Sequence, residues 1–296
     1  MPSLTFSIII ASYNYAHLLT RAIESALSQT CTDYEIIVVD DGSTDNTPEV
    51  VQPYLDKIQY HRQKNSGHCA TNNKGVSLAS GKYFYFLDAD DEMLEDALVH
   101  FKEAIQEYGE VPLFFGGYIS VNEKGEESVN IGTGIDSQPY AALKAYLSKK
   151  VVGIQHGSIV VHRTVFDQLN YPEGVKNNTD IVFLGQVLSR YQAIGIKVPV
   201  VKIHAHPDRV RSNSNLIVSV GLSVVDSLFD PERIPTELMP LKELYRRRRT
   251  LSIFRVLYKS GDYRGCRRYY IQAVKDSPVL LLKLGYLRKF CMSFFR

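Results

Sequence analysis

The first hundred residues alternate short, mainly apolar runs with segments in which apolar residues recur at helical spacing. The runs at 6–10, 35–39 and 83–87 have the length of strands, and the segments 17–29, 73–79 and 94–108 carry the helical spacing. Thr47-Pro48-Glu49 is a typical helix start, because proline is tolerated in a first turn. Continuous apolar strands that alternate with helices predict an α/β fold with a mainly parallel sheet and helices on both faces.

The remainder of the chain has a more mixed pattern. Strands are expected at 112–119, 158–161 and 197–203, a hairpin turn at 122–125 and a helix at 180–191. Beyond residue 241 the pattern is helical and basic, and one stretch resembles a single tetratricopeptide unit. A solenoid needs about three such repeats, so we expect an isolated helical hairpin.

Polar residues follow three of the predicted strands at the point where each strand ends. These segments are 11–14, 40–43 and 88–91. In open α/β sheets, ligands bind beyond the carboxyl ends of the strands. The pattern therefore predicts that these three segments meet in one functional site.

The charge of the chain is unevenly distributed. The formal net charge is +2, but residues 241–296 contain 15 Lys and Arg against three acidic residues, whereas residues 1–240 contain 19 against 29. The basic tail also carries many aromatic and aliphatic residues. It suits either an anionic membrane surface or a solvated face of helices packed on the body. Nucleic acid is not expected, because no recognition motif accompanies the charge.

Composition and cysteine spacing exclude several classes of protein. With 45% hydrophobic and 22% charged residues, the chain has the composition of a globular protein. The four cysteines have no spacing typical of zinc sites and are expected to be reduced thiols. We see neither a secretory signal nor a run long enough to span a bilayer. The expectation is a cytoplasmic protein, or one held peripherally at the inner face of the cell membrane.

The segment Asp88-Ala89-Asp90-Asp91 has the composition of a cation site. Three carboxylates within four residues repel one another unless a cation or hydrogen-bond donors compensate them. A hard divalent cation shared with a substrate diphosphate fits this composition. The alternative is a solvated turn with helix-capping aspartates. Other phosphate-binding signatures fail: Gly75 to Gly81-Lys82 has the wrong spacing for a P-loop, and Gly132-Thr133-Gly134 lacks the third glycine of a dinucleotide fingerprint.

Five segments in order resemble family 2 glycosyltransferases of the GT-A fold. They are 7–14, 25–30, 35–45, 65–75 and 81–91, and together they span most of the first hundred residues. The resemblance implies a Rossmann-like α/β domain with a nucleotide-sugar-binding half at 1–100, an acceptor-binding and catalytic half at 101–225, and a basic helical C-terminal extension at 226–296.

The resemblance implies roles for residues of the nucleotide half. Ala11, Tyr13 and Asp41 would contact the nucleotide base, Asp88 the ribose or phosphate side, and Asp90 a Mn²⁺ or Mg²⁺ ion. Where many relatives have Arg-Asn before the helix glycine, this chain has Asn72-Asn73. Lys74 or Lys64 would then replace the missing cationic contact to the diphosphate.

Roles in the second half are implied less closely. Asp180, at the start of a helix, aligns with the catalytic base of the family, although Thr179 stands where relatives usually have Glu. The alternative for Asp180 is an acid placed only to suit the helix dipole. His206, with His204, would be a metal ligand or diphosphate contact.

Two further residues complete the expected site. Arg211, in a flap after His206, would supply charge to the diphosphate, and His156 would line the acceptor side. We therefore expect an inverting, hexosyltransferase-type enzyme that uses a nucleotide sugar, a UDP-sugar above others, and a glycan or lipid-linked acceptor. The competing hypothesis is a non-catalytic nucleotide-sugar-binding or membrane-docking partner, and a nucleotidyltransferase is a weaker third.

Overall fold

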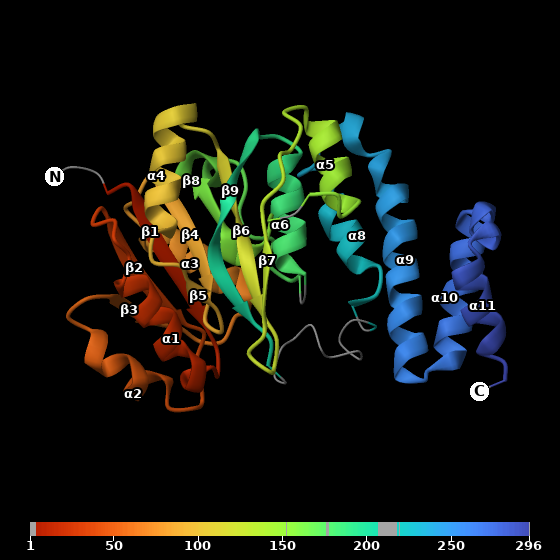
Figure 1. Ribbon diagram of the computed structural model, residues 1–296, viewed down its shortest axis with the longest axis horizontal. Coiled ribbons are helices and arrows are strands. Elements are labelled where there is room, and N and C mark those ends of the chain that lie inside the picture. The colour runs from red at the N-terminus through yellow and green to blue at the C-terminus, as the bar shows by residue number, and fades with distance from the viewer. Residues whose placement is uncertain (1–3, 152, 176–177, 207–217, 219, 296) are drawn as a thin grey trace. The chain divides into compact units, whose positions relative to one another are not determined.

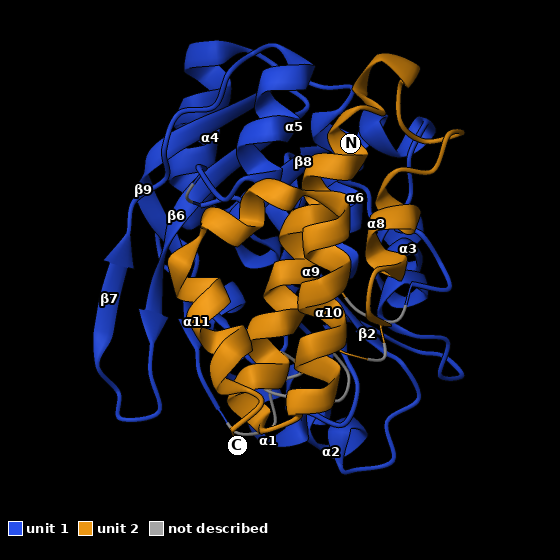
Figure 2. Ribbon diagram, turned by 90° about the vertical axis from the view of Figure 1, so that its right-hand side faces the viewer, with its two compact units in different colours: residues 1–175, 179–206 blue, residues 176–178, 207–296 orange. Residues whose placement is uncertain are grey.

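The computed structural model describes residues 4–151, 153–175, 178–206, 218 and 220–295 of the chain. The chain divides into two compact units, coloured separately in Figure 2. Unit 1 comprises residues 1–175 and 179–206, and unit 2 comprises residues 176–178 and 207–296. The domain boundaries expected at residues 100 and 225 stay predictions.

Unit 1 is built on one mixed sheet (Figure 1). Its strands are β1 (Phe6–Ser12), β2 (Tyr34–Asp40), β3 (Gln59–Arg62), β4 (Tyr83–Asp88), β5 (Glu92–Met93), β6 (Leu113–Val121), β7 (Glu127–Asn130), β8 (Ile159–His162) and β9 (Ala193–His204). They lie in the order β3-β2-β1-β4-β8-β6-β9-β5, with β7 paired to β6. The pairs among β1 to β4 are parallel, as expected, and β6 is also parallel to β9.

Apart from the hairpin, the antiparallel pairs were not expected from the sequence. Strand β8 pairs antiparallel with both β4 and β6, and β5 and β7 pair antiparallel with β9 and β6. The β6–β7 hairpin turns at 122–125 as expected. The sheet is therefore parallel where the apolar runs are continuous and mixed beyond β4.

Helices cover the sheet on both faces because successive strand residues point to opposite sides. In β1, Ile8 and Ile10 join one apolar cluster with α1 (Ala16–Leu27) and α4 (Ala97–Tyr108), while Ile9 joins another with α3 (His68–Leu78) and α6 (Thr179–Leu188). The other helical segments of unit 1 are α2 (Thr47–Val51), η1 (Gln52–Tyr54), α5 (Pro139–Leu147), η2 (His156–Ser158) and η3 (Arg163–Asp167).

Two helices begin three or more residues away from their expected starts, whereas α1 and α6 begin within one residue of theirs. Helix α3 begins at His68, five residues before the expected start. The sequence pattern did not reveal this start, because the first turn is polar and apolar residues do not mark the helical spacing there. Helix α4 begins at Ala97 and not at 94, because Glu92 and Met93 add to the sheet beside β9 and the Leu94 N–H donates to the Val200 carbonyl.

Unit 2 is helical in its described part. It contains α8 (Ser223–Leu228), η5 (Thr236–Leu238), α9 (Leu241–Ser260), α10 (Tyr263–Asp276), η6 (Pro278–Leu282) and α11 (Leu284–Met292). Helix α9 ends at Gly261 in the left-handed region, with φ of 82°, and the Asp262 carboxylate accepts from the Gly265 N–H at 2.8 Å to cap α10. The expected helical hairpin is confirmed as α9–α10, and α11 adds a third helix to it.

Two further observations bear on the class of protein. Within the described residues, none of the helices combines the length and apolar character required to cross a bilayer. The four cysteines, all within the described residues, form no disulfide, and three of them are buried.

Candidate functional site

The three polar strand ends lie side by side at the carboxyl edge of the sheet. The register pairs Ser12 of β1 with Asp40 of β2, and Ala11 of β1 with Asp88 of β4. Ala11 is half-buried in this row, and Tyr13 lies just beyond it with 44% of its surface exposed. The meeting of these segments, predicted from the pattern of strand ends, is confirmed.

The aspartates after β2 are buried and hydrogen-bonded to the chain itself. Asp41 accepts from the backbone N–H groups of Ser66 at 2.9 Å and Gly67 at 2.8 Å, and from the Gln63 side chain at 2.8 Å. These bonds hold the loop that leads into α3, whose first residue, His68, follows Gly67. Asp41 therefore braces the loop, and its predicted contact with a nucleotide base stays a prediction.

Asp40 braces the neighbouring turn in the same way. It accepts from the Ser43 N–H at 2.8 Å and from the Tyr60 hydroxyl at 2.8 Å, and it pairs with Arg62 at 3.4 Å. Asp40 is fully buried, and burial together with this carboxylate raises the pKa of Tyr60. These contacts keep the Tyr60 hydroxyl protonated as a donor to Asp40.

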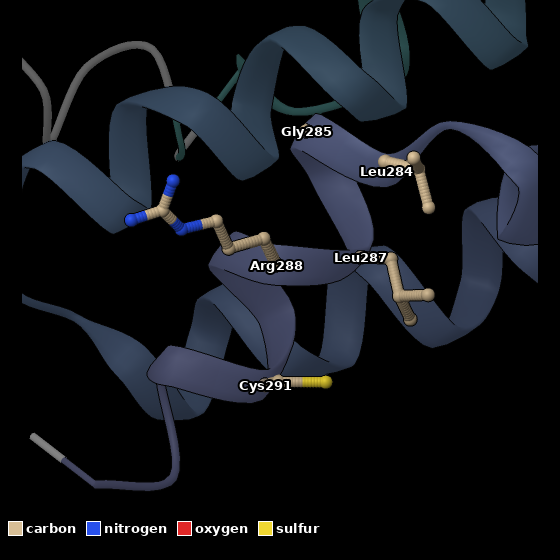
Figure 3. A pocket seen from close by; sticks show the side chains of 5 residues that line it. All are labelled: Leu284, Gly285, Leu287, Arg288 and Cys291. Carbon is tan, nitrogen blue, oxygen red and sulfur yellow. The ribbon is translucent and has the colours of Figure 1, made fainter.

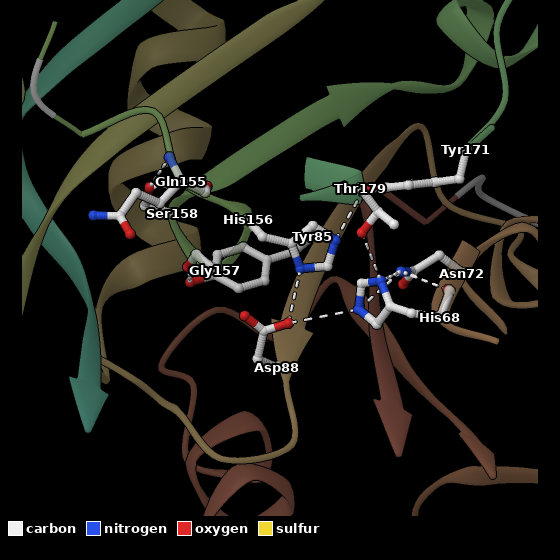
Figure 4. Close-up of polar contacts among 10 residues, drawn as sticks. All are labelled: His68, Asn72, Tyr85, Asp88, Gln155, His156, Gly157, Ser158, Tyr171 and Thr179. Carbon is white, nitrogen blue, oxygen red and sulfur yellow. Dashed lines mark hydrogen bonds and ion pairs between the residues drawn. The ribbon is translucent and has the colours of Figure 1, made fainter. Parts of the chain in front are cut away.

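Asp88, at the end of β4, faces two histidines instead (Figure 4). Its Oδ1 lies 3.0 Å from Nδ1 of His156 and 3.9 Å from Nε2 of His68. Burial by itself would raise the pKa of Asp88, but the two histidines hold it well below its usual range. Asp88 is therefore ionised at neutral pH while a third of its side chain stays exposed.

Buried hydrogen bonds fix the position of His156. The Tyr85 hydroxyl donates at 2.6 Å to the carbonyl of Gly157, in the same short helix η2, and Nε2 of His156 lies 3.0 Å from the Tyr171 hydroxyl. Burial first, and then the nearby Asp88, raise the pKa of Tyr171 well above its usual value. The imidazole of His156 is thus held between the Tyr171 hydroxyl and the Asp88 carboxylate.

His68 links Asp88 to the start of α6. Its Nδ1 lies 3.2 Å from the Thr179 hydroxyl, and the Asn72 amide lies 3.2 and 3.3 Å from its two ring nitrogens. Asp180 follows Thr179 in the first turn of α6 and is half-buried. Asp180 also contributes to the raised pKa of Tyr171, which places its charge near the same network.

The two asparagines at 72 and 73 have structural contacts. Asn72 is buried and holds His68, and Asn73 exchanges two hydrogen bonds of 2.9 Å with the backbone of Tyr171. Asn72 and Thr179, the two positions that depart from the expected family pattern, therefore contact the same side chain, His68.

A second acid–histidine pair lies after β4. Oδ2 of Asp90 is 2.9 Å from Nε2 of His206, just beyond β9. His204 turns elsewhere: its Nε2 lies 3.1 Å from Glu92, and its backbone N–H donates to Asp91 at 3.1 Å. Burial, with the nearby Arg21, lowers the pKa of His204 against the opposing effect of Glu92. Of the two histidines expected beside Asp90, the structure brings His206 to it.

The donor atoms present fit a hard divalent cation. Single oxygens of Asp88, Asp90 and Asp91 lie within 4.8 Å of one another, and the ligand atoms of His68, Asp88 and His156 form a second such group. Carboxylate oxygens are ligands for Mg²⁺ and Mn²⁺, and imidazole suits the transition metals. The acid-rich segment could therefore hold a cation, with Asp88 shared between the two groups.

The other expected site residues are two exposed lysines, one arginine outside the described residues, and His156, which belongs to this network. Lys74 and Lys64 are both exposed, the first on α3 and the second in the loop before it. Arg211 lies outside the described residues. His156, expected on the acceptor side, is buried beneath Asp88.

Sequence reasoning missed His68 and Tyr171. Their contacts join residues that are far apart in the chain. His68 and Thr179, for example, are 111 positions apart, so no spacing rule reveals the contact. The available signal for His68 was its place: it follows a glycine at the start of a helix whose N-terminus faces the carboxyl edge of the sheet.

Comparison with known proteins adds the family. The model of the family described as glycosyl transferase family 2 matches residues 7–169. An uncharacterised glycosyltransferase of Nostoc sp. is 44% identical over 104 residues, which is 34% of this chain and 32% of that protein. Another from Rickettsia felis is 29% identical over 234 residues, which is 76% of this chain and 37% of that protein. The chain spans about a third of the length of the curated relatives it matches first.

Among solved structures, residues 1–349 of S. aureus TarS share the fold. The TM-score is 0.65 at 17% identity, and the match covers 98% of this chain and 89% of that one. The same TarS fragment has been solved with UDP and with UDP-GlcNAc. The mixed sheet flanked by helices, followed by a helical C-terminal region, is thus a GT-A type fold. The family model matches more than half of the chain, and the chain belongs to glycosyl transferase family 2.

Proposed function

We propose that this chain is an inverting glycosyltransferase that moves a sugar from a nucleoside-diphosphate sugar, a UDP-sugar above others, to a hydroxyl group of a glycan or lipid-linked acceptor. Family membership supports the reaction class, and the UDP and UDP-GlcNAc complexes of TarS support the donor class. The observation that carries the proposal is the meeting of Ala11, Asp88 and the Asp90–His206 pair at one edge of the sheet. Asp180 follows Thr179, whose hydroxyl contacts His68 of the same network.

In this proposal, Asp180 is the general base. It takes the proton of the acceptor hydroxyl while that oxygen attacks the anomeric carbon and the bond to the diphosphate breaks, its electron pair leaving with the nucleotide. One displacement at one carbon inverts its configuration, so an α-linked donor gives a β-linked product. General-base catalysis of this kind contributes about 10²–10⁴-fold to the rate.

Asp90 and His206 would hold the metal, beside Asp88 and Asp91. A bound Mn²⁺ or Mg²⁺ supplies Lewis-acid neutralisation of the departing diphosphate. The chain's own contribution is to keep these ligands ready: His156 and His68 hold Asp88 ionised, and Tyr85 and Tyr171 fix His156.

The proposal is tested by nucleotide release and donor binding measured together. Wild type should release UDP from a UDP-sugar in a metal-dependent way, and Asp180→Asn should lower that release by about 10²–10⁴-fold while the donor still binds. Asp96→Asn, which makes the same change just before α4, is the matched control and should release UDP at the wild-type rate.

A chain that binds the donor but releases no UDP with any acceptor would instead be the non-catalytic nucleotide-sugar-binding protein. The engagement of Thr179 with His68, where relatives have an acid, is the feature that favours this second candidate. Release that Asp180→Asn leaves unchanged would remove Asp180 from the mechanism.

A further inference from the structure

The last segment of unit 2 exposes large apolar side chains beside cations. From η6 through α11, the exposed fractions are 66% for Val279, 78% for Leu282 and 76% for Leu284, and 89% for Phe295 beyond the helix. Leu281 and Phe294 are exposed as well. Folded proteins rarely gather so many large apolar groups in one exposed stretch without a partner for them.

This exposure is not a failure of the segment to pack. Leu280 is buried with Leu251 and Ala273, and Tyr286 and Phe290 pack on the cluster that α9 and α10 form around Phe254 and Tyr270. Helix α11 therefore already has an inward side. The exposed apolar residues lie in η6, at the first residue of α11 and beyond its end, so the segment also presents apolar groups to its outside.

A cavity of about 420 Å³ lies against α11. It is lined by the exposed residues Leu284, Gly285, Arg288 and Cys291 and by Leu287, which also packs on the inward cluster. Figure 3 shows Leu284, Leu287 and Cys291 extending to one side of the helix and Arg288 extending to the other. Apolar side chains on one side and a cation on another are the pattern of a helix that lies in the plane of a membrane surface.

The charge of the segment distinguishes between partners. Residues 277–296 contain four Lys and Arg and no Asp or Glu. Two copies of the chain that met through this surface would bring like charges together, which opposes association. Anionic lipid headgroups complement the cations, and the acyl region takes up the exposed leucines and phenylalanines.

We propose that residues 277–295, with Lys275, dock on the surface of an anionic phospholipid bilayer, α11 lying along that surface. The exposed leucines and phenylalanines insert among the lipids, while Lys275, Lys283 and Arg288, all exposed, contact the headgroups. This docking is independent of the proposed transfer reaction, because it uses no residue of the site in unit 1.

The test is sedimentation of the full chain with vesicles, in the absence of nucleotide sugar and metal. Wild type should bind vesicles of phosphatidylglycerol and phosphatidylcholine, bind pure phosphatidylcholine weakly, and lose binding as salt is raised. The triple variant Lys275→Gln, Lys283→Gln, Arg288→Gln should bind the anionic vesicles about a hundredfold more weakly, since each nearby cation contributes about a fivefold factor.

Two matched controls separate docking from general charge and general hydrophobicity. The triple variant Arg248→Gln, Arg255→Gln, Lys259→Gln makes the same change of charge at exposed positions of α9 and should weaken binding far less. Leu282→Ser with Leu284→Ser should weaken binding at least about tenfold, whereas Val129→Ser with Ile131→Ser, at exposed positions of unit 1, should leave it unchanged.

Equal losses in the two charge variants would overturn the proposal, as would vesicle binding that the leucine variant leaves intact. Light scattering of the wild type in solution tests whether the chain associates with itself through this surface. A dimer that Leu282→Ser with Leu284→Ser converts to a monomer would identify a second copy of the chain, and not a bilayer, as the partner of this surface.

Discussion

Two strands of the sheet, β2 and β4, lie on either side of β1 and end in aspartates, and the two groups of aspartates have different surroundings. After β2, Asp40 and Asp41 accept hydrogen bonds from backbone N–H groups, a tyrosine and a glutamine of their own loops. After β4, Asp88 and Asp90 face the ring nitrogens of histidines.

The comparison shows that composition and position do not decide the role of a strand-end carboxylate. A carboxylate whose oxygens accept backbone N–H groups is committed to the fold, because releasing them leaves buried donors without partners. A carboxylate that faces imidazole can exchange that partner for a cation or a substrate. The aspartates after β2 are expected to stabilise the loops, and those after β4 to carry the chemistry.

The largest expected effect is on the β4 side. Asp90→Asn should lower the rate of sugar transfer by about 10²–10³-fold, because a charge that would hold the cation at the leaving diphosphate is removed. The melting temperature should change little, since an amide at this position can keep the contact with His206. Transfer rate and thermal unfolding of the same preparations check this. An unfolded Asp90→Asn protein would show that the acids at the end of β4 also stabilise the fold.

The matching change on the β2 side should act on stability. Asp41→Asn should lower the free energy of unfolding by about 1–3 kcal/mol, because an amide cannot accept all the N–H groups that the carboxylate accepts from Ser66, Gly67 and Gln63. Chemical denaturation measures the loss. An Asp41→Asn protein as stable as wild type would show that the loop does not depend on this carboxylate.

A change beside His156 tests whether the acids at the end of β4 depend on their imidazole partners. Tyr171→Phe removes the hydroxyl that lies 3.0 Å from His156 and should cost about 1 kcal/mol of stability. It should also lower kcat several-fold with little change in KM, because His156 is then less well held against Asp88. Steady-state kinetics separates the two constants, and Tyr108→Phe, at an exposed tyrosine of α4, should change neither.

The smallest expected effect concerns a carboxylate at the opposite end of β2. Although burial opposes it, hydrogen bonds from Ser7 and Ser80 lower the pKa of Glu35. Its stabilisation is therefore present above the unfolded pKa of about 4.3 and is lost as the pH falls through the lower folded pKa. Glu35→Gln should cost about 1 kcal/mol at pH 7, reduced by its partial exposure.

Unfolding curves of Glu35→Gln and wild type across pH 3–7 check this sign. The difference between the two proteins should shrink toward the acid end. A difference that grows as the pH falls would contradict it.

The sequence predicted the parallel half of the sheet and its polar edge because both are local signals. The apolar runs of β1, β2 and β4 are continuous, and the acids follow them directly. Strand β8 inserts antiparallel between β4 and β6, and no local pattern encodes pairing between Tyr83 and His162. The same limit applies to the site, where the acids were visible and the partners that distinguish Asp41 from Asp88 were not.

The departures at Asn72 and Thr179 illustrate the same limit. In the sequence they are two unrelated losses of charge. In the structure they hold one histidine, His68, beside Asp88. Only the folding of α3 against the start of α6 brings them together.

The most direct test is Mn²⁺ binding by titration calorimetry to wild type, Asp90→Asn and Asp41→Asn, with a thermal melt of each protein. Asp90→Asn should lose Mn²⁺ binding and keep its melting temperature, while Asp41→Asn should keep Mn²⁺ binding and melt at a lower temperature. Undiminished Mn²⁺ binding by Asp90→Asn, or its loss in a fully stable Asp41→Asn protein, would contradict the assignment of chemistry to the end of β4.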